Sequence, residues 1–361
     1  MFDYSNLLRD SMKIKPASKR AARQKSSSTP DDIFRMNYNE SPFGPSPKAM
    51  EVLTNACKKS YEYPDWFSIE LKKNIVSFYG LDISNIVTGS GASALICMLG
   101  EIFINKGDEF IIGDPSYEAF RDVAYDYGAA PILVPLTENL DYDLDAMLRA
   151  VTPKTKMLII CNPNNPTGTF VDSEKLEEFI KKIPEHVITV IDEAYLEYVT
   201  KENTYSMVKL IKANYAKPLI VLKTFSKIYG MAGLRIGYAV TSPDLADCMC
   251  KSSHAWNVSR IGQLAASAAI TDQEYIHNIR DVIAKERIKV SNALKDMGCR
   301  VYESQANFIL FKCSVDSLEV SSKLAEDKIL IGAPCGYNRV SLALPGMNDK
   351  FISCMKKILS K

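Results

Sequence analysis

The residue with the clearest chemical potential in this sequence is Lys227, which stands within the stretch Lys223–Tyr238. Residues 218–222 are apolar and predict a buried strand, and a second apolar strand is expected over residues 236–240. Lys227 lies on the hydroxyl-rich turn between them. In a closed site, loss of water lowers the pKa of a lysine and leaves a nucleophilic amine, which forms a Schiff base with an aldehyde. An ordinary solvated lysine in a basic loop is the other interpretation; it fits Lys227 alone but not the whole stretch.

Three groups near Lys227 suit a phosphate, namely the hydroxyls of Thr224 and Ser226 and the guanidinium of Arg235. The stretch reads S-K-x-x-G-x-x-G-L-R-x-G-Y. It resembles the pyridoxal phosphate (PLP) lysine signature of fold-type I aminotransferases, in particular of the histidinol-phosphate aminotransferase branch. The resemblance implies that Lys227 forms the internal aldimine with the cofactor. It also implies that Thr224 and Arg235 hold the cofactor phosphate.

A carboxylate follows the continuous apolar strand predicted over residues 187–191. Asp192 at this strand end would be costly to bury without a cationic partner. The protonated pyridine nitrogen of PLP is such a partner, and the pair maintains an electron sink for a Cα carbanion. The resemblance implies this role for Asp192, and a hydroxyl contact to the cofactor's phenolic oxygen for Tyr195. Without a cofactor, Asp192 would read as a helix N-cap.

A rigid turn is expected after the apolar residues 157–160, because Asn162–Gly168 reads N-P-N-N-P-T-G and contains two Asn-Pro steps. This motif is specific to the same aminotransferase group. The resemblance implies that Asn165 donates to the cofactor's phenolic oxygen. A structural Asx-turn remains the alternative, more for Asn162 than for Asn165.

Small residues connect a predicted strand at 86–88 to an apolar helix, and glycines in such a position free backbone N–H groups for a phosphate. The sequence G-S-G-A-S is not the dinucleotide fingerprint G-x-G-x-x-G. By resemblance, Gly91, Ala92 and Ser93 form the phosphate cup. Tyr117 follows another buried strand and either packs at a helix start or, as the resemblance implies, stacks on the cofactor ring.

The substrate side of the site is expected around Arg339, which opens an apolar strand and whose guanidinium suits a carboxylate or phosphate. By resemblance, Arg339 clamps the substrate's anionic group together with Asn165 and Tyr38, the latter in the irregular segment at the mouth of the site. Enzymes of histidinol phosphate usually carry a second arginine after the preceding strand, and here that position is Gly332. We therefore expect a plain amino acid to be preferred over histidinol phosphate.

Tyr63 stands in a Y-P-D motif and is held extended by the following proline. Its ring could be ordinary core packing. In the family that the chain resembles, this tyrosine reaches across a dimer interface to the partner's cofactor phosphate. The resemblance therefore implies a homodimer in which Tyr63 completes the partner's site.

From residue 84 the chain alternates strands with helices, which predicts an α/β fold with a mostly parallel central sheet, and long helices follow the lysine stretch. The resemblance implies a fold-type I PLP transferase with a large domain and a smaller α+β domain made from both chain ends. We expect an N-terminal arm at 1–45 that joins the small domain, the PLP-binding domain at 46–242, and the small domain at 243–361.

Composition excludes several classes of protein. Of the 361 residues, 47% are hydrophobic and 24% charged, and a formal net charge of +1 gives no reason to expect nucleic acid or a membrane surface as partner. No apolar run approaches the ~20 residues of a bilayer span, and no secretory signal is visible. The nine cysteines have no framework spacing, which favours reduced thiols in the cytoplasm. Cys248, Cys250 and His254 lack a fourth ligand, so no metal is expected. A basic cluster (Lys13, Lys15, Lys19, Arg20, Arg23 and Lys25) is expected on a solvated arm or a docking tail.

The motifs occur in family order from Asn37 onward. They imply a PLP-dependent aminotransferase that moves an amino group between an amino acid, or an amino-phosphate such as histidinol phosphate, and a 2-oxo acid by a ping-pong mechanism. Lys227, Asp192 and Tyr195 would be its catalytic residues. A PLP decarboxylase or lyase, similar to threonine-phosphate decarboxylase, stays open. A nicotinamide dehydrogenase is disfavoured by the missing fingerprint, and a DNA-binding regulator by an N-terminal arm too short for a helix-turn-helix.

Overall fold

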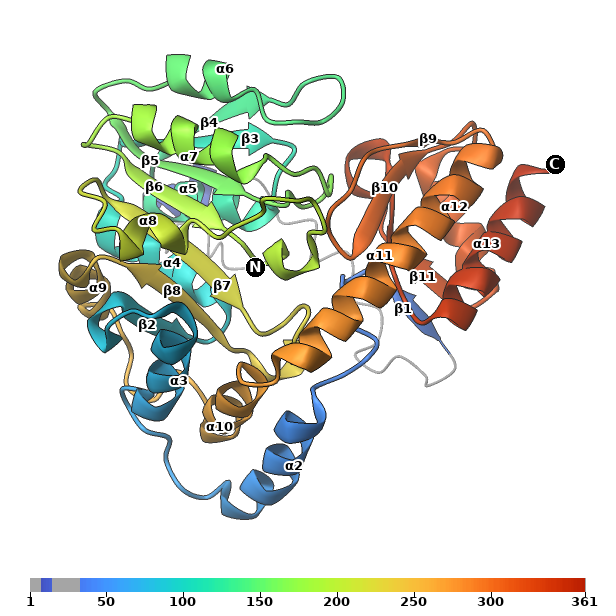
Figure 1. Cartoon of the computed structure of the whole chain (residues 1–361). Coiled ribbons are helices and arrows are strands. Elements are labelled where there is room, and N and C mark those ends of the chain that lie inside the picture. The colour runs from blue at the N-terminus through green and yellow to red at the C-terminus, as the bar shows by residue number, and fades with distance from the viewer. Residues whose placement is uncertain (1–7, 15–32, 361) are drawn as a thin grey trace, which may run out of the picture.

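The computed structural model of this chain describes residues 8–14 and 33–360 (Figure 1). The basic cluster near the N-terminus falls mostly outside the described residues: Lys13 lies in the short helix α1 (Asp10–Ile14), and its other five members are not described. None of the helices in the described ranges is both long enough and apolar enough to cross a bilayer.

A seven-stranded sheet forms the centre of the larger part of the molecule, in the order β2-β8-β7-β6-β5-β3-β4. Its strands are β2 (Ile86–Gly89), β3 (Glu109–Asp114), β4 (Ala130–Pro135), β5 (Thr155–Cys161), β6 (Ile188–Asp192), β7 (Leu219–Thr224) and β8 (Gly237–Thr241). Only β8 runs antiparallel to its neighbours, and the remaining pairs are parallel. The predicted mostly parallel sheet is confirmed. β6 is the middle strand and buried throughout, as its apolar sequence predicts.

Side chains alternate between the two faces of this sheet, and each face is covered by helices. In β5, Ile159 joins one buried cluster and Leu158 and Ile160 join the other. The helices on the first face are α4 (Ala92–Phe103), α5 (Glu118–Tyr127) and α9 (Pro243–Cys250); those contributing to the second cluster include α3 (Ile69–Tyr79), α6 (Leu144–Arg149), α7 (Ser173–Lys182) and α8 (Val208–Lys212). Burial on both faces explains why the strands read as continuous apolar runs.

The smaller part contains two further sheets and three helices, seen at the right of Figure 1. Strands β9 (Arg300–Val301), β10 (Phe308–Lys312) and β12 (Asn338–Ser341) are antiparallel, while β1 (Phe34–Met36) runs parallel to β11 (Ile329–Ile331). Its helices are α11 (Gln273–Asp296), α12 (Ser317–Glu326) and α13 (Pro345–Leu359). The expected return of the N-terminal segment to the C-terminal part is therefore seen in the β1–β11 pair.

Two further helices, α2 (Pro47–Ala56) and α10 (Arg260–Ala269), pack against each other. Helix α2 begins at Ser46, whose Oγ accepts a hydrogen bond from the Ala49 N–H, as the Ser-Pro pair predicts. Single-turn 3-10 helices are η3 (Cys57–Lys59), η4 (Ile83–Asn85), η5 (Leu196–Tyr198), η6 (Ala232–Leu234) and η7 (Pro334–Gly336). The division into an arm and two domains at residues 45 and 242 stays a prediction.

Candidate active site

Lys227 lies just after β7, at the edge where the carboxyl ends of β5, β6 and β7 meet. Its Nζ donates a hydrogen bond to the carbonyl oxygen of Tyr38 at 3.2 Å and lies 5.4 Å from the ring centre of Tyr195. Burial, together with the nearby Arg339 guanidinium, lowers the pKa of Lys227 to about 8. This is the direction that a nucleophilic amine requires.

Asp192 ends β6 and is 3% exposed. Its Oδ1 accepts a hydrogen bond from the Ala194 N–H at 3.0 Å, and burial raises its pKa to about 6. Among the described residues, no cationic side chain forms an ion pair with Asp192. A buried carboxylate in this condition fits a cationic ligand such as a protonated ring nitrogen.

Tyr195 is equally buried and faces the same space. Its hydroxyl oxygen accepts a hydrogen bond from Asn39 Nδ2 at 3.2 Å, and its ring packs edge-on against Phe308. Burial raises the pKa of Tyr195 far above its usual value, so the hydroxyl stays protonated and able to donate.

Asn165 and Arg339 come together from distant parts of the chain. The Arg339 Nη1 donates to Asn165 Oδ1 at 2.5 Å, and Nη2 donates to the Asn37 carbonyl at 2.9 Å. Because its oxygen is held by Arg339, Asn165 keeps its amide N–H groups for another acceptor. Asn162 instead exchanges two hydrogen bonds with the backbone of Val171, each 2.8 Å, which is a structural role.

A cradle for an anion forms where β2 meets helix α4. Gly91 has φ +85°, and a Cβ there would lie 2.5 Å from Arg235 Nη2, so the backbone and the guanidinium approach closely. Arg235 Nη1 also donates to Ser226 Oγ at 3.3 Å. The Ser93 hydroxyl hydrogen-bonds with Tyr117 at 3.1 Å, so two predicted site residues are in contact. Free N–H groups at a helix start combined with an arginine suit a phosphate.

Thr224 ends β7, and its role in holding the cofactor phosphate stays a prediction. Its hydroxyl donates to the Ile236 carbonyl at 3.3 Å and accepts from the Ser226 N–H at 3.1 Å. Ser226 is the hydroxyl residue that contacts Arg235. The sequence motif contains both residues, and nothing in it distinguishes which hydroxyl meets the guanidinium.

Tyr63 is 77% exposed and stacks on Trp256, with ring centres 4.7 Å apart. Its contacts in the described part of the chain include neither Lys227 nor Asp192. The interpretation of Tyr63 as ordinary core packing is therefore wrong.

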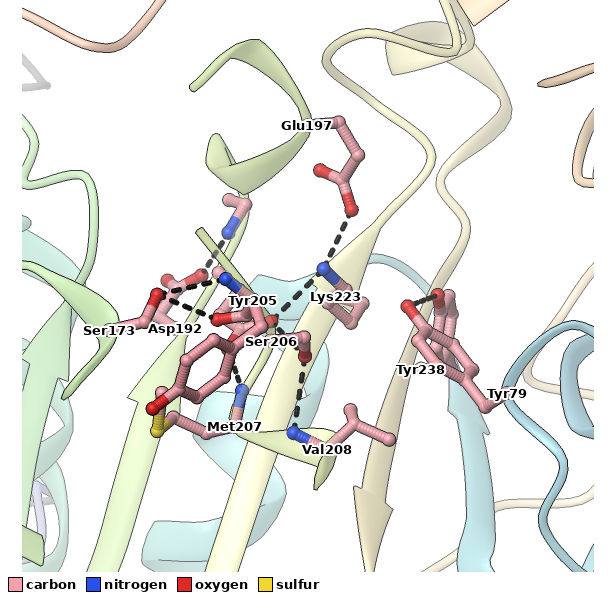
Figure 2. A network of polar contacts seen from close by, with 12 residues as sticks. Tyr79, Ser173, Asp192, Glu197, Tyr205, Ser206, Met207, Val208, Lys223 and Tyr238 are labelled. Atoms are coloured by element: carbon pink, nitrogen blue, oxygen red, sulfur yellow. Dashed lines mark hydrogen bonds and ion pairs between the residues drawn. The ribbon is translucent and has the colours of Figure 1, made fainter. Parts of the chain in front are cut away.

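Behind the site, a second lysine is buried in a polar network that sequence reasoning missed (Figure 2). Lys223 Nζ lies 3.1 Å from Glu193 and 2.6 Å from Glu197. Glu193 also accepts hydrogen bonds from the Ser206 hydroxyl and the Met207 N–H. Burial alone would lower the pKa of Lys223, but the two carboxylates raise it well above its usual value. The network links the ends of β6 and β7 beside Asp192.

The three parts of the site match three groups of PLP: its aldehyde, its ring nitrogen and its phosphate. The Lys227 amine of lowered pKa suits the aldehyde, the cradle suits the phosphate, and Asp192, which has no ion-pair partner among the described residues, suits the ring nitrogen. Within residues 8–14 and 33–360, no group of three His, Cys, Asp or Glu side chains is placed to hold a metal ion.

Comparison with known proteins gives the same result. Residues 31–350 match the family Aminotransferase class I and II. The histidinol-phosphate aminotransferase of Moorella thermoacetica is 35% identical over 91% of this chain and 86% of that protein. The aromatic amino acid aminotransferase of Cutibacterium acnes is 31% identical over 91% of this chain and 93% of that protein. The histidinol-phosphate aminotransferase of Sinorhizobium meliloti, solved with pyridoxal 5'-phosphate, superposes with a TM-score of 0.85 at 26% identity, covering 97% and 99% of the two chains. The chain therefore belongs to the class I and II aminotransferases and is a pyridoxal 5'-phosphate-dependent enzyme of fold type I.

Proposed function

We propose that this aminotransferase prefers a plain amino acid as amino donor and that Arg339 binds its carboxylate. The observation that carries the proposal is the pair of residues facing each other across the β-bridge after β11, Arg339 and Gly332. Gly332 brings no charge next to Arg339, so this corner offers one guanidinium fork. One fork suits a single carboxylate, whereas a dianionic phosphate gains from a second donor.

The proposed roles of the other residues follow from their positions. When bound, PLP supplies the aldehyde that captures the substrate amine and the ring that delocalises the electrons of the broken Cα–H bond. Lys227 would take the proton from the substrate Cα and later donate it back, since its pKa near 8 suits a base at neutral pH. Asp192 would keep the ring nitrogen protonated, and Asn165 and Tyr195 would donate to the phenolic oxygen.

Further contacts would fix the cofactor and substrate in place. The N–H groups and hydroxyl at Gly91, Ala92 and Ser93 would bind the phosphate with Arg235, and Thr224 would join them by turning its hydroxyl. Tyr117 would stack on the ring. Tyr38, whose carbonyl contacts Lys227, would face the substrate.

Steady-state kinetics with matched donors test the substrate preference. We expect kcat/KM for plain amino acids, aromatic ones included, to exceed that for histidinol phosphate, and the reverse order would overturn the proposal. Gly332→Arg should raise kcat/KM for histidinol phosphate by roughly 10–100-fold, because a charge-assisted hydrogen bond contributes about 1.5–3 kcal/mol. A Cβ at Gly332 meets atoms at ordinary contact distances, so the substitution fits. Gly346→Arg adds the same charge in open space and is the control.

Decarboxylation is the second candidate, and it has weaker support. The threonine-phosphate decarboxylase of Porphyromonas gingivalis superposes with a TM-score of 0.79, but at 20% identity this likeness shows the fold alone. Release of CO₂ from any donor that supports turnover would favour it over transamination.

We also infer a homodimer in which Tyr63 reaches the partner's site. Exposed aromatic side chains continue from Tyr63 through ring contacts to Trp256, Trp66 and Phe67, and such a patch marks an interface. Mixing Tyr63→Ala with Lys227→Ala subunits tests this. If Tyr63 serves the partner, the heterodimer has one complete site and activity returns. If mixing restores nothing while heterodimers form, Tyr63 does not cross.

Two broader proposals remain. The chain would divide into an arm and two domains at residues 45 and 242, although α9 and α10 pack against elements of the large sheet and its helices. The enzyme would act in the cytoplasm, which its nine free cysteines support. Limited proteolysis and fractionation test these two proposals respectively.

A further inference from the structure

Asn39 is a buried asparagine between β1 and α2 that sequence reasoning left without a role. It is 2% exposed and has φ +55°, a left-handed conformation that asparagine and glycine adopt more readily than other residues. The Asn307 Nδ2 donates to its carbonyl oxygen at 3.2 Å. The backbone of Asn39 is therefore held firmly at the junction of the two parts of the molecule.

The side-chain amide of Asn39 has a defined orientation. The backbone N–H of Asn39 donates to the Ser341 Oγ at 2.9 Å, and the Ser341 hydroxyl donates to the side-chain Oδ1 of Asn39 at 2.9 Å. If the amide were reversed, Ser341 would accept two hydrogen bonds and its own hydrogen would have no acceptor among the described residues. The amide nitrogen must therefore face the Tyr195 hydroxyl, to which it donates at 3.2 Å.

This contact decides what the Tyr195 hydroxyl can do. A phenol has one hydrogen to give, and an amide N–H can only donate to it. Tyr195 accepts from Asn39, and within the described part of the chain its own hydrogen has no recorded acceptor. That hydrogen is thus available to a ligand in the site.

We propose that Asn39 is a positioning residue that directs the Tyr195 hydrogen toward the phenolic oxygen of PLP. The inference rests on the proposed role of Tyr195. It extends that role to a residue that acts through its hydrogen bond to Tyr195. Because Ser341 lies two residues after Arg339 on β12, the same contacts join the carboxylate-binding strand to the cofactor side of the site.

Two substitutions of Asn39 distinguish a role in directing the Tyr195 hydrogen from a role in supporting the fold. Asn39→Asp keeps size and shape but presents an oxygen that accepts the Tyr195 hydrogen, so the hydroxyl turns away from the cofactor. Asn39→Gly tolerates φ +55° and removes the amide without redirecting the hydroxyl. If Asn39 only supports the fold, glycine should be the more damaging change. If Asn39 directs the Tyr195 hydrogen, Asn39→Asp should be the more damaging change.

The readout is the pH midpoint of the visible absorbance of the holoenzyme without substrate, with cofactor dissociation measured alongside. A donor to the phenolic oxygen stabilises its fully anionic form and so lowers this midpoint. We expect Asn39→Asp to raise the midpoint by about one pH unit and to weaken cofactor binding, and Asn39→Gly to raise it less. An equal or larger shift for glycine would overturn the proposal.

Asn39→Asp also adds a negative charge, and repeating it in a Tyr195→Phe background measures the effect of that charge alone on the midpoint. We expect most of the aspartate shift to vanish there, since no hydroxyl remains to be turned. If Tyr195→Phe alone leaves the midpoint unchanged, the role of Tyr195 fails and the inference fails with it. If Tyr195→Phe shifts the midpoint but Asn39→Asp does not, only the inference on Asn39 fails. Ser341→Ala should give a smaller shift in the same direction.

Discussion

Lys223 and Lys227 stand four positions apart in one stretch, and the structure gives them opposite properties. Lys223 lies between two carboxylates, which raise its pKa well above the usual value. Lys227 has no carboxylate in ion-pair contact among the described residues and lies near Arg339, and its pKa falls to about 8. Lys223 is buried and Lys227 partly buried, and loss of water acts to lower the pKa of both amines, so burial alone does not make a lysine reactive. The identity of the charged neighbours decides whether the amine is neutralised for chemistry or kept charged for structure.

The largest expected effect is loss of the reactive lysine. Lys227→Ala should abolish the visible absorbance of the holoenzyme and reduce kcat by more than about 1000-fold, since acid-base catalysis alone contributes roughly 10²–10⁴-fold. A spectrum and a turnover assay measure both. Lys223→Arg is the matched control and should keep the band. A Lys227→Ala protein that retained the band would show that another amine binds the cofactor.

The structural lysine should show the opposite pattern. Lys223→Met leaves Glu193 and Glu197 without their cation and should cost about 3–5 kcal/mol in the free energy of unfolding, while the visible band remains. Urea unfolding of the holoenzyme measures the cost. Lys223→Arg should recover most of it. A Lys223→Met protein of unchanged stability would mean that the ion pairs contribute no net stabilisation.

The smallest expected effect concerns Asp192, whose carboxylate interacts electrostatically with both lysines. Burial raises the pKa of Asp192 to about 6, above the unfolded value near 3.8, so the folded cofactor-free protein binds the extra proton. Its stability should therefore fall as pH rises from about 4 through 6. Asp192→Asn removes the ionisable group and with it this fall in stability at high pH. Cofactor-free Asp192→Asn should be more stable than wild type by up to about 3 kcal/mol at pH 8 and nearly equal at pH 4.

Thermal unfolding of the two cofactor-free proteins across this pH range provides the measurement. The same substitution should lower activity of the holoenzyme, since Asn cannot supply the charge that faces the ring nitrogen. An Asp192→Asn protein less stable than wild type at pH 8 would contradict the absence of a cationic partner.

The sequence predicts most of the elements because strong apolar runs and turn residues mark their ends. The strand expected at residues 86–88 lies within β2 (Ile86–Gly89), and β6 lies at the middle of the sheet, as its apolar sequence predicts. Strand boundaries differ by one or two residues: the strands expected over residues 218–222 and 236–240 are β7 (Leu219–Thr224) and β8 (Gly237–Thr241). The motif residues Lys227, Asp192 and Asn165 gather at one sheet edge because parallel strands end together there.

What the sequence could not predict are contacts between polar residues from distant segments. The pairing of Lys223 with Glu193 and Glu197 joins two strands and a 3-10 turn, and no local pattern specifies it. The Asn39–Ser341 contact joins residues at opposite ends of the chain. Each depends on side-chain direction within the finished fold, whereas hydrophobic periodicity reports only which face is buried.

The pairing of β1 with β11 has a consequence for how this protein is made. A ribosome delivers Phe34 long before its partner Ile329, and a pairing so distant in the sequence forms late. The segment after β1, with Tyr38 and Asn39, therefore stays untethered while Lys227 and Asp192 are already in place. A nascent chain stopped before β11 would carry the reactive amine on a folded sheet without the Tyr38 carbonyl that it contacts in the finished protein.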